Sequence, residues 1–189
     1  MLTKNSFYEI NSEKELGEIY IYLKKFKFSK DDIKDEHEIL SVLLFITSTS
    51  KSSLLDFPVK IHWSESPDFR FEFIKNLRTI GIEHVRATLP EYKMADRELQ
   101  NRPHGTFLEP SFYSPFNTLP KKEAYSGIRC LGEKLKGDGW EGDSLEVEWA
   151  YTILNAFISK TNLLNKNHFE IFDENYLLIE DDSPVNLFR

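Results

Sequence analysis

The sequence predicts a mixed α/β fold with the element order α-α-β-β-β-α-β. Three observations support this order. Apolar residues recur at helical spacing in two segments near the start of the chain and in one segment after residue 143. Between residues 57 and 85 they alternate with polar residues instead, which is typical of strands. The last helical segment is long enough to carry the chain across to a parallel strand.

The first predicted helix begins at a capping box, Ser12-Glu13-Lys14-Glu15, and runs to about Lys25. The second begins near Asp31 or Asp32 and ends in the polar run 47–51, which predicts a loop. Five residues at helical spacing form the apolar face of this second helix: Ile39, Leu40, Leu43, Leu44 and Ile46.

Three alternating segments predict neighbouring antiparallel strands at residues 59–63, 69–73 and 79–85. A third helix, capped by Asp143 or Ser144, follows later in the chain. The short apolar segment 177–180 then predicts a fourth strand beside the third one, because the helix between them serves as a crossover.

The chain has 189 residues, of which 40% are hydrophobic, so we expect a single domain with one sizeable core over 1–189. Residues 1–30 form an accessory N-terminal segment, and the core comprises residues 31–89 and 143–182. Between them, residues 90–142 are rich in proline and glycine, which predicts a long irregular insertion.

Composition narrows the function classes. Cys130 is the only cysteine, which excludes an intrachain disulfide and a cysteine metal cluster and favours a reducing compartment. The first residues lack the pattern of a signal peptide, so we expect the cytoplasm. The net charge of -7 disfavours non-specific attraction to a polyanion.

No His-Glu-x-x-His, phosphate-binding glycine loop or G-x-S-x-G elbow occurs, which argues against zincins, P-loop proteins and α/β-hydrolases.

The most informative motif is a pair of carboxylates. Asp68 follows Ser66-Pro67 at the start of one predicted strand, and Glu83 lies in the segment 80–85 within the neighbouring strand. A hairpin of this kind brings both carboxylates to one end of the sheet. Two anionic groups at close range repel each other unless a cation or proton lies between them, so the pair predicts bound Mg²⁺ or Mn²⁺.

These motifs and the order α-β-β-β-α-β over residues 31–181 resemble the restriction-endonuclease-like core of the PD-(D/E)xK nuclease superfamily. The bacterial members with a Pro-Asp-Phe strand followed by Ile-Gly-Ile-Glu are especially similar. The resemblance implies metal-dependent hydrolysis of phosphodiester bonds in DNA or RNA. It implies that Asp68 and Glu83 are catalytic metal ligands, with the backbone carbonyl of His84 as a third ligand.

The sequence departs from this pattern at Val85, where the motif has a lysine. Members of the superfamily can supply the lysine from the following helix, and Lys160 is the candidate here, although a lysine that snorkels over apolar surface would explain it equally well. The superfamily often adds a glutamate from the first core helix. Glu36 is the expected residue and Glu38 the alternate, and a solvated helix charge is the competing explanation for both.

Six basic residues of the insertion, interleaved with aromatic ones, are candidate nucleic-acid contacts: Lys93, Arg97, Arg102, Lys121, Lys122 and Arg129. Solvated loop charge is the alternative explanation, because acidic residues are interspersed among them. The second function that the sequence leaves open is a nuclease fold without catalysis, acting as a binding or regulatory module through a protein partner. A homodimer is also open.

Overall fold

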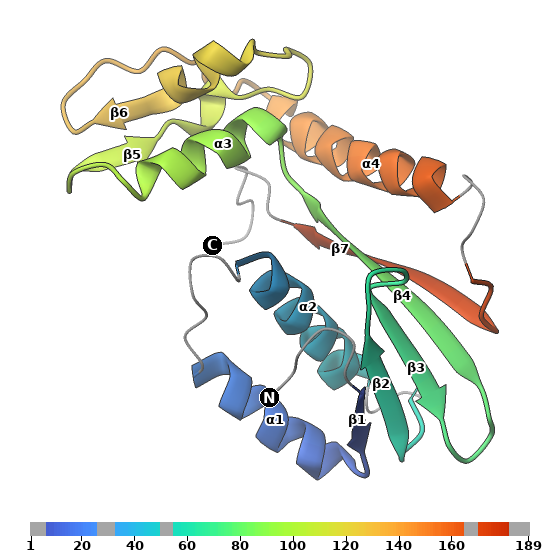
Figure 1. The fold of residues 1–189 in the computed structure, drawn as a ribbon. Helices are drawn as coiled ribbons and strands as arrows, with labels where there is room; N and C mark the ends of the chain where they lie inside the picture. Colours follow the sequence, from blue (N-terminus) through green and yellow to red (C-terminus); the bar gives the residue numbers. More distant parts are fainter. Residues whose placement is uncertain (1–6, 26–32, 50–54, 165–169, 182–189) are drawn as a thin grey trace. The chain divides into compact units, whose positions relative to one another are not determined.

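The computed structural model describes residues 7–25, 33–49, 55–164 and 170–181 (Figure 1). By their contacts, the residues divide into two compact units. Unit 1 comprises Met1–Val85 and Asn162–Glu180, and unit 2 comprises Arg86–Thr161 and Asp181–Arg189. Each unit is described by itself below, and the expected single domain with a core at 31–89 and 143–182 stays a prediction.

Unit 1 is built on a five-stranded, mostly antiparallel sheet with the strand order β1-β2-β3-β4-β7. The predicted middle strands are confirmed as neighbours: β2 (Val59–Trp63), β3 (Phe69–Phe73) and β4 (Thr79–Ala87) pair in sequence order. In β2 and β3 every second residue is buried, which is the pattern that the alternation predicts. The mixed α/β class is therefore confirmed.

The last strand, β7 (Glu174–Asp181), lies beside β4, as predicted, and begins three residues earlier than expected. Both arrows point the same way in Figure 1. Side-chain contacts agree with this direction, because Thr79 at the start of β4 donates its N–H to Asp173 just before β7 (2.7 Å), and His84 contacts Glu180 near the end of both strands. The pair is thus parallel.

The first strand, β1 (Phe7–Ile10), was missed by sequence reasoning. It pairs antiparallel with β2, from Phe7 opposite His62 to Ile10 opposite Val59. Its residues fall within the segment 1–30 that the sequence predicts as accessory, and Ile10 is buried in the main core. Four residues are too few for alternation to be recognised as a strand pattern.

Two helices of unit 1 contribute to that core: α1 (Glu13–Lys25) and α2 (Ile33–Thr49). The capping box is confirmed, because the backbone N–H of Glu15 donates to Ser12 Oγ at 3.3 Å. Leu44 is 51% exposed and Val42 is buried in the core instead, so one member of the expected apolar face is wrong.

The end of α2 also differs from the expectation of a loop over 47–51. The helix continues to Thr49, because the hydroxyl groups of Thr47 and Thr49 donate to the carbonyl oxygens of Leu43 and Phe45, each at 2.7 Å. Because the two hydroxyl groups find hydrogen-bond acceptors in the backbone of the same helix, these polar residues can lie within it.

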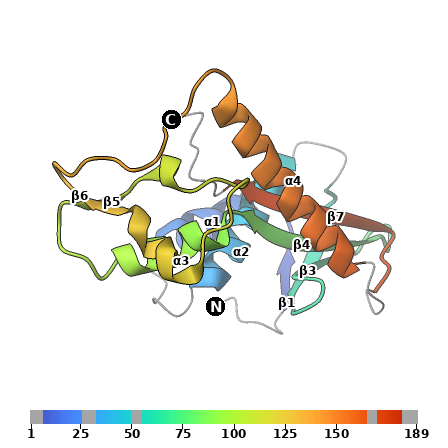
Figure 2. The same cartoon turned by 90° about the horizontal axis from the view of Figure 1, so that it is seen from above.

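Unit 2 is more regular than the predicted insertion. It contains α3 (Pro90–Leu99), the paired strands β5 (Thr106–Leu108) and β6 (Ile128–Cys130), and most of α4 (Ser144–Leu164). Strands β5 and β6 lie side by side in both views (Figures 1 and 2). The expectation of an irregular segment at 90–142 is wrong for α3, β5 and β6, and α3 starts at Pro90 because a proline is well tolerated in the first turn of a helix.

A buried ion pair holds the β5–β6 hairpin together. Glu109 is 1% exposed and accepts from Arg129 Nε at 2.9 Å, and it also accepts from the backbone N–H groups of Lys136 and Gly137. Although burial raises the pKa of Glu109, the hydrogen bonds from these two backbone groups and from Arg129 lower it overall. Glu109 therefore ties the loop after β6 to the hairpin.

Among the described helices, none is both long and apolar enough to cross a bilayer.

Candidate functional site

The candidate site lies at one end of the unit 1 sheet. Strands β2, β4 and β7 end there, and β3 begins there, because β3 runs antiparallel to its neighbours. Four ionisable residues at this end of the sheet or on α2 are buried: Glu38, Asp68, Glu83 and His84. Burial of this many ionisable groups together is costly unless they are paired or serve a function, which marks this region as the candidate site.

The two carboxylates of the motif lie at one end of the β3–β4 hairpin. Phe69 pairs with Ile82, so one further step along this register sets Asp68 opposite Glu83. The backbone N–H of His84 donates to Asp68 Oδ2 at 2.7 Å, and both Asp68 and Glu83 are less than a tenth exposed. The structure therefore brings together the residues that the sequence expects at one sheet end.

The turn before β3 fixes the backbone of Asp68. Ser64 donates its N–H to the carbonyl oxygen of Asp68 at 3.0 Å, and its hydroxyl donates to the carbonyl oxygen of Pro67. These bonds close the turn between β2 and β3 and leave the Asp68 side chain aimed at the β4 backbone.

The helix α2 contributes Glu38 to this end of the unit. Glu38 is 2% exposed and accepts from the indole N–H of Trp63 at 3.2 Å, while the Trp63 ring stacks on Phe69. The side chain of Glu36, the residue expected from the sequence, lies outside the described side chains. A signal for Glu38 was present, because it precedes the core residues Val42 and Ile46 by four and eight positions and so shares their helix face.

Glu180 joins two histidines from different elements. Its Oε1 lies 2.7 Å from His37 Nδ1 on α2, and its Oε2 lies 3.1 Å from His84 Nε2 on β4. Burial would raise the pKa of Glu180, but the hydrogen bonds from His37 and His84 outweigh it and lower the pKa to about 2. Because an ionised carboxylate only accepts, each histidine presents an N–H to it. Sequence reasoning missed this arrangement, whose partners are 143 and 96 residues apart.

The residue at the motif-lysine position, Val85, is half-buried and apolar. Lys160, the expected substitute, is half-buried on the part of α4 that belongs to unit 2, whereas Asp68 and Glu83 belong to unit 1. Its approach to the two carboxylates therefore stays a prediction.

The six candidate nucleic-acid contacts occupy different environments within unit 2. Arg97, Lys121 and Lys122 are exposed, and Lys93 is half-buried. Arg102 forms a surface ion pair with Glu98 at 2.9 Å. Arg129 is only 4% exposed, because its guanidinium forms the internal pair with Glu109. Their role in binding stays a prediction.

The donor set at the sheet end suits a hard divalent cation, since Mg²⁺ and Mn²⁺ prefer carboxylate and carbonyl oxygens. Asp68 and Glu83 would supply two carboxylates, and the His84 carbonyl would supply a third oxygen. Within the described ranges, no group of three or more His, Cys, Asp and Glu side chains is arranged to hold a metal ion.

Comparison of the chain with protein-family models, with curated proteins and with solved structures found no match.

Proposed function

We propose that this protein is a metal-dependent nuclease that hydrolyses phosphodiester bonds of DNA or RNA, with a restriction-endonuclease-like core. The observation that carries the proposal is the buried pair of Asp68 and Glu83 on opposing positions of β3 and β4. The succession α2-β2-β3-β4-α4-β7, with β7 beside β4, supports the fold part of the proposal.

In this proposal Asp68 and Glu83 hold Mg²⁺ or Mn²⁺ together with the carbonyl oxygen of His84. The bound ion would position water and neutralise charge on the phosphate. The chain's own contribution is orientation. The His84 N–H donates to Asp68 Oδ2 at 2.7 Å and so orients this carboxylate. Glu38 adds a further buried carboxylate on the α2 side, next to Trp63.

Incubation of the purified protein with single- and double-stranded DNA and RNA, with Mg²⁺ or Mn²⁺, tests the proposal. We expect cleavage that Asp68→Asn lowers by about a hundredfold or more, the scale of removing one well-placed charged group. Asp173→Asn is the matched control, because Asp173 is an exposed carboxylate of the same unit that bonds Thr79. Equal cleavage by the two variants would contradict the assignment of Asp68.

Ion binding gives a readout without a substrate. A ligand that binds only the folded state at a hundredfold excess over Kd stabilises it by about 2.7 kcal/mol. Mn²⁺ should therefore raise the melting temperature of the wild type and of Asp173→Asn, and raise that of Asp68→Asn much less. A shift of the same size in all three proteins would show that the ion binds elsewhere.

One observation favours a second function, a binding or regulatory module with the same fold and a protein partner. Val85 is apolar where the nuclease motif has a cation, so the position itself supplies no charge to a reacting phosphate. If the wild type cleaves no substrate with either metal and Val85→Lys cleaves, the natural chain is the module. Cleavage by the wild type would reject this alternative.

A further inference from the structure

Two of the elements that carry buried carboxylates of the site, α2 and β4, meet at one side chain of β7. Glu180, on β7, contacts His37 on α2 and His84 on β4 through separate oxygen atoms. His37 immediately precedes Glu38 in the chain, and His84 immediately follows Glu83. The contact of Glu180 with each histidine therefore fixes the backbone beside a carboxylate of the site.

His84 also contacts the third carboxylate of the site, Asp68. Its side chain is 5% exposed and contacts Glu180, while its backbone N–H donates to Asp68 Oδ2 at 2.7 Å. A displaced imidazole would shift the β4 backbone at the residue whose N–H orients Asp68. Mutation of groups that orient a metal ligand from behind in this way typically lowers metal affinity by about 10–100-fold.

We propose that Glu180 is the positioning residue of this site: it holds the His84 backbone against Asp68 and ties α2, with Glu38, to β4. The proposal rests on the proposed function for its effect on metal binding, but its structural part concerns this chain alone. Glu180 touches no reacting group and acts only through the two histidines.

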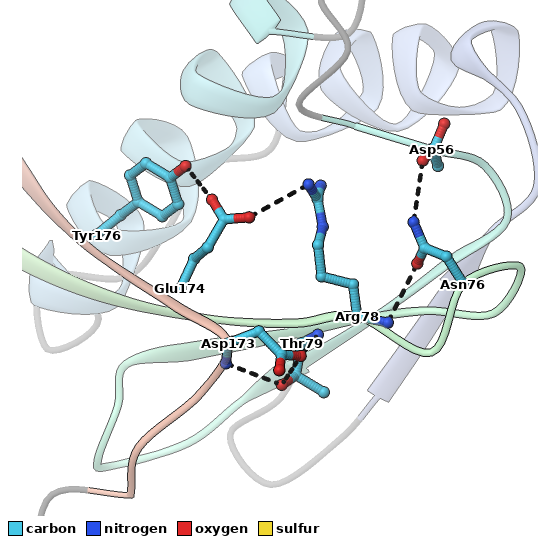
Figure 3. Close-up of polar contacts among 7 residues, drawn as sticks. All are labelled: Asp56, Asn76, Arg78, Thr79, Asp173, Glu174 and Tyr176. Atoms are coloured by element: carbon cyan, nitrogen blue, oxygen red, sulfur yellow. Dashed lines mark hydrogen bonds and ion pairs between the residues drawn. The ribbon is translucent and has the colours of Figure 1, made fainter.

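The same strand offers a matched control at its other end. Glu174 pairs with Arg78 at 3.3 Å and accepts from the Tyr176 hydroxyl, as Figure 3 shows. Glu174 thus lies in β7, is partly exposed like Glu180, and forms an ion pair, but its network includes the β3–β4 turn rather than the site. A variant of Glu174 perturbs β7 without touching His37 or His84.

The structural part is tested by the amide signal of His84 in ¹H–¹⁵N spectra of the full chain. A short bond to a carboxylate protects an amide from exchange with solvent. We expect Glu180→Leu, which removes both bonds and retains volume, to shift this signal and to raise its exchange rate at least tenfold. Glu174→Leu should leave both unchanged. If Glu180→Leu also leaves them unchanged, the positioning role is overturned, whatever the activity of the protein.

The functional part is tested by the Mn²⁺ concentration that gives half-maximal binding and half-maximal cleavage. Glu180→Leu should raise both by about tenfold or more, at unchanged substrate KM, and Glu180→Asp should restore part of the loss. Glu174→Leu should change neither. A perturbed His84 amide in a protein whose wild type binds no Mn²⁺ would reject the metal site and the proposed function while the structural link stands. Unchanged Mn²⁺ constants in Glu180→Leu, with wild-type binding present, would overturn the proposed positioning of the site.

Discussion

At the scale of single residues, Gly81 shows how closely β7 approaches β4. A Cβ atom at this position would lie 2.5 Å from Cδ2 of Phe172 and 2.9 Å from Oδ1 of Asn175. Phe172 is buried, so its ring has little room to move. The glycine is therefore required by close packing against Phe172 within the strand that carries Glu83 and His84, rather than by an unusual backbone conformation.

Gly81→Ala should lower the free energy of unfolding by about 1–3 kcal/mol, because the added methyl group overpacks the contact with Phe172. Urea unfolding followed by circular dichroism measures it. Gly17→Ala is the control: nothing lies within 4 Å of a Cβ at Gly17, which is within α1, so this change should stabilise by about 0.5–1 kcal/mol. If both variants are equally stable, the contact with Phe172 is not as tight as described.

At the scale of elements, the strengths and gaps of the sequence analysis have physical causes. Strands β2 and β3 were predictable because one of their faces is buried and their apolar residues alternate, whereas β4 is buried on both faces over residues 80–84. The opposite positions of Asp68 and Glu83 followed from the β3–β4 hairpin. The contacts of Glu180 with His37 and His84 were not predictable, because they join residues far apart in the chain and leave no local sequence pattern. The helix α3 was not predictable from its start, because Pro90 is as typical of a loop as of the first turn of a helix.

The β5–β6 hairpin of unit 2 depends on one charged group, and this makes its stability sensitive to pH. Glu109 has a lowered pKa in the folded chain, so its ionised form stabilises unit 2 at pH values above its ordinary pKa of 4.5. This stabilisation is lost progressively as the pH falls from 4.5 through the lowered pKa of the folded chain, because the unfolded chain takes up a proton at Glu109 before the folded chain does.

Glu109→Gln should therefore destabilise unit 2 by about 3 kcal/mol or more at pH 7, since it leaves Arg129 buried without its counter-charge. The difference from wild type should shrink as the pH is lowered below 4.5. Hydrogen exchange of the β5 and β6 amides between pH 3 and pH 7 measures this difference. The exposed Glu123 supplies the control Glu123→Gln, which should match wild type throughout. A difference that grows at low pH would refute the assignment of the charge.

At the scale of the whole molecule, the boundaries between the two units fall inside secondary-structure elements. They lie between Val85 and Arg86 in β4, between Thr161 and Asn162 in α4, and between Glu180 and Asp181 in β7. Boundaries between independent domains usually fall in flexible linkers.

We therefore expect the chain to unfold in one cooperative step. Calorimetry should show a single transition whose midpoint is lowered both by Gly81→Ala in unit 1 and by Glu109→Gln in unit 2, with equal van't Hoff and calorimetric enthalpies. Two transitions, each moved by only one of the variants, would show instead that the units are independent domains and would contradict the single domain predicted from the sequence.

The lone cysteine has a consequence for any study of self-association. Cys130 ends β6, is exposed and has no second cysteine within the chain, so oxidation by air can join it only to a thiol of another molecule. Two copies linked in this way would sediment as a dimer without any natural interface between them. Sedimentation of Cys130→Ser, or of wild type kept under a reductant, therefore separates a covalent artefact from a true homodimer.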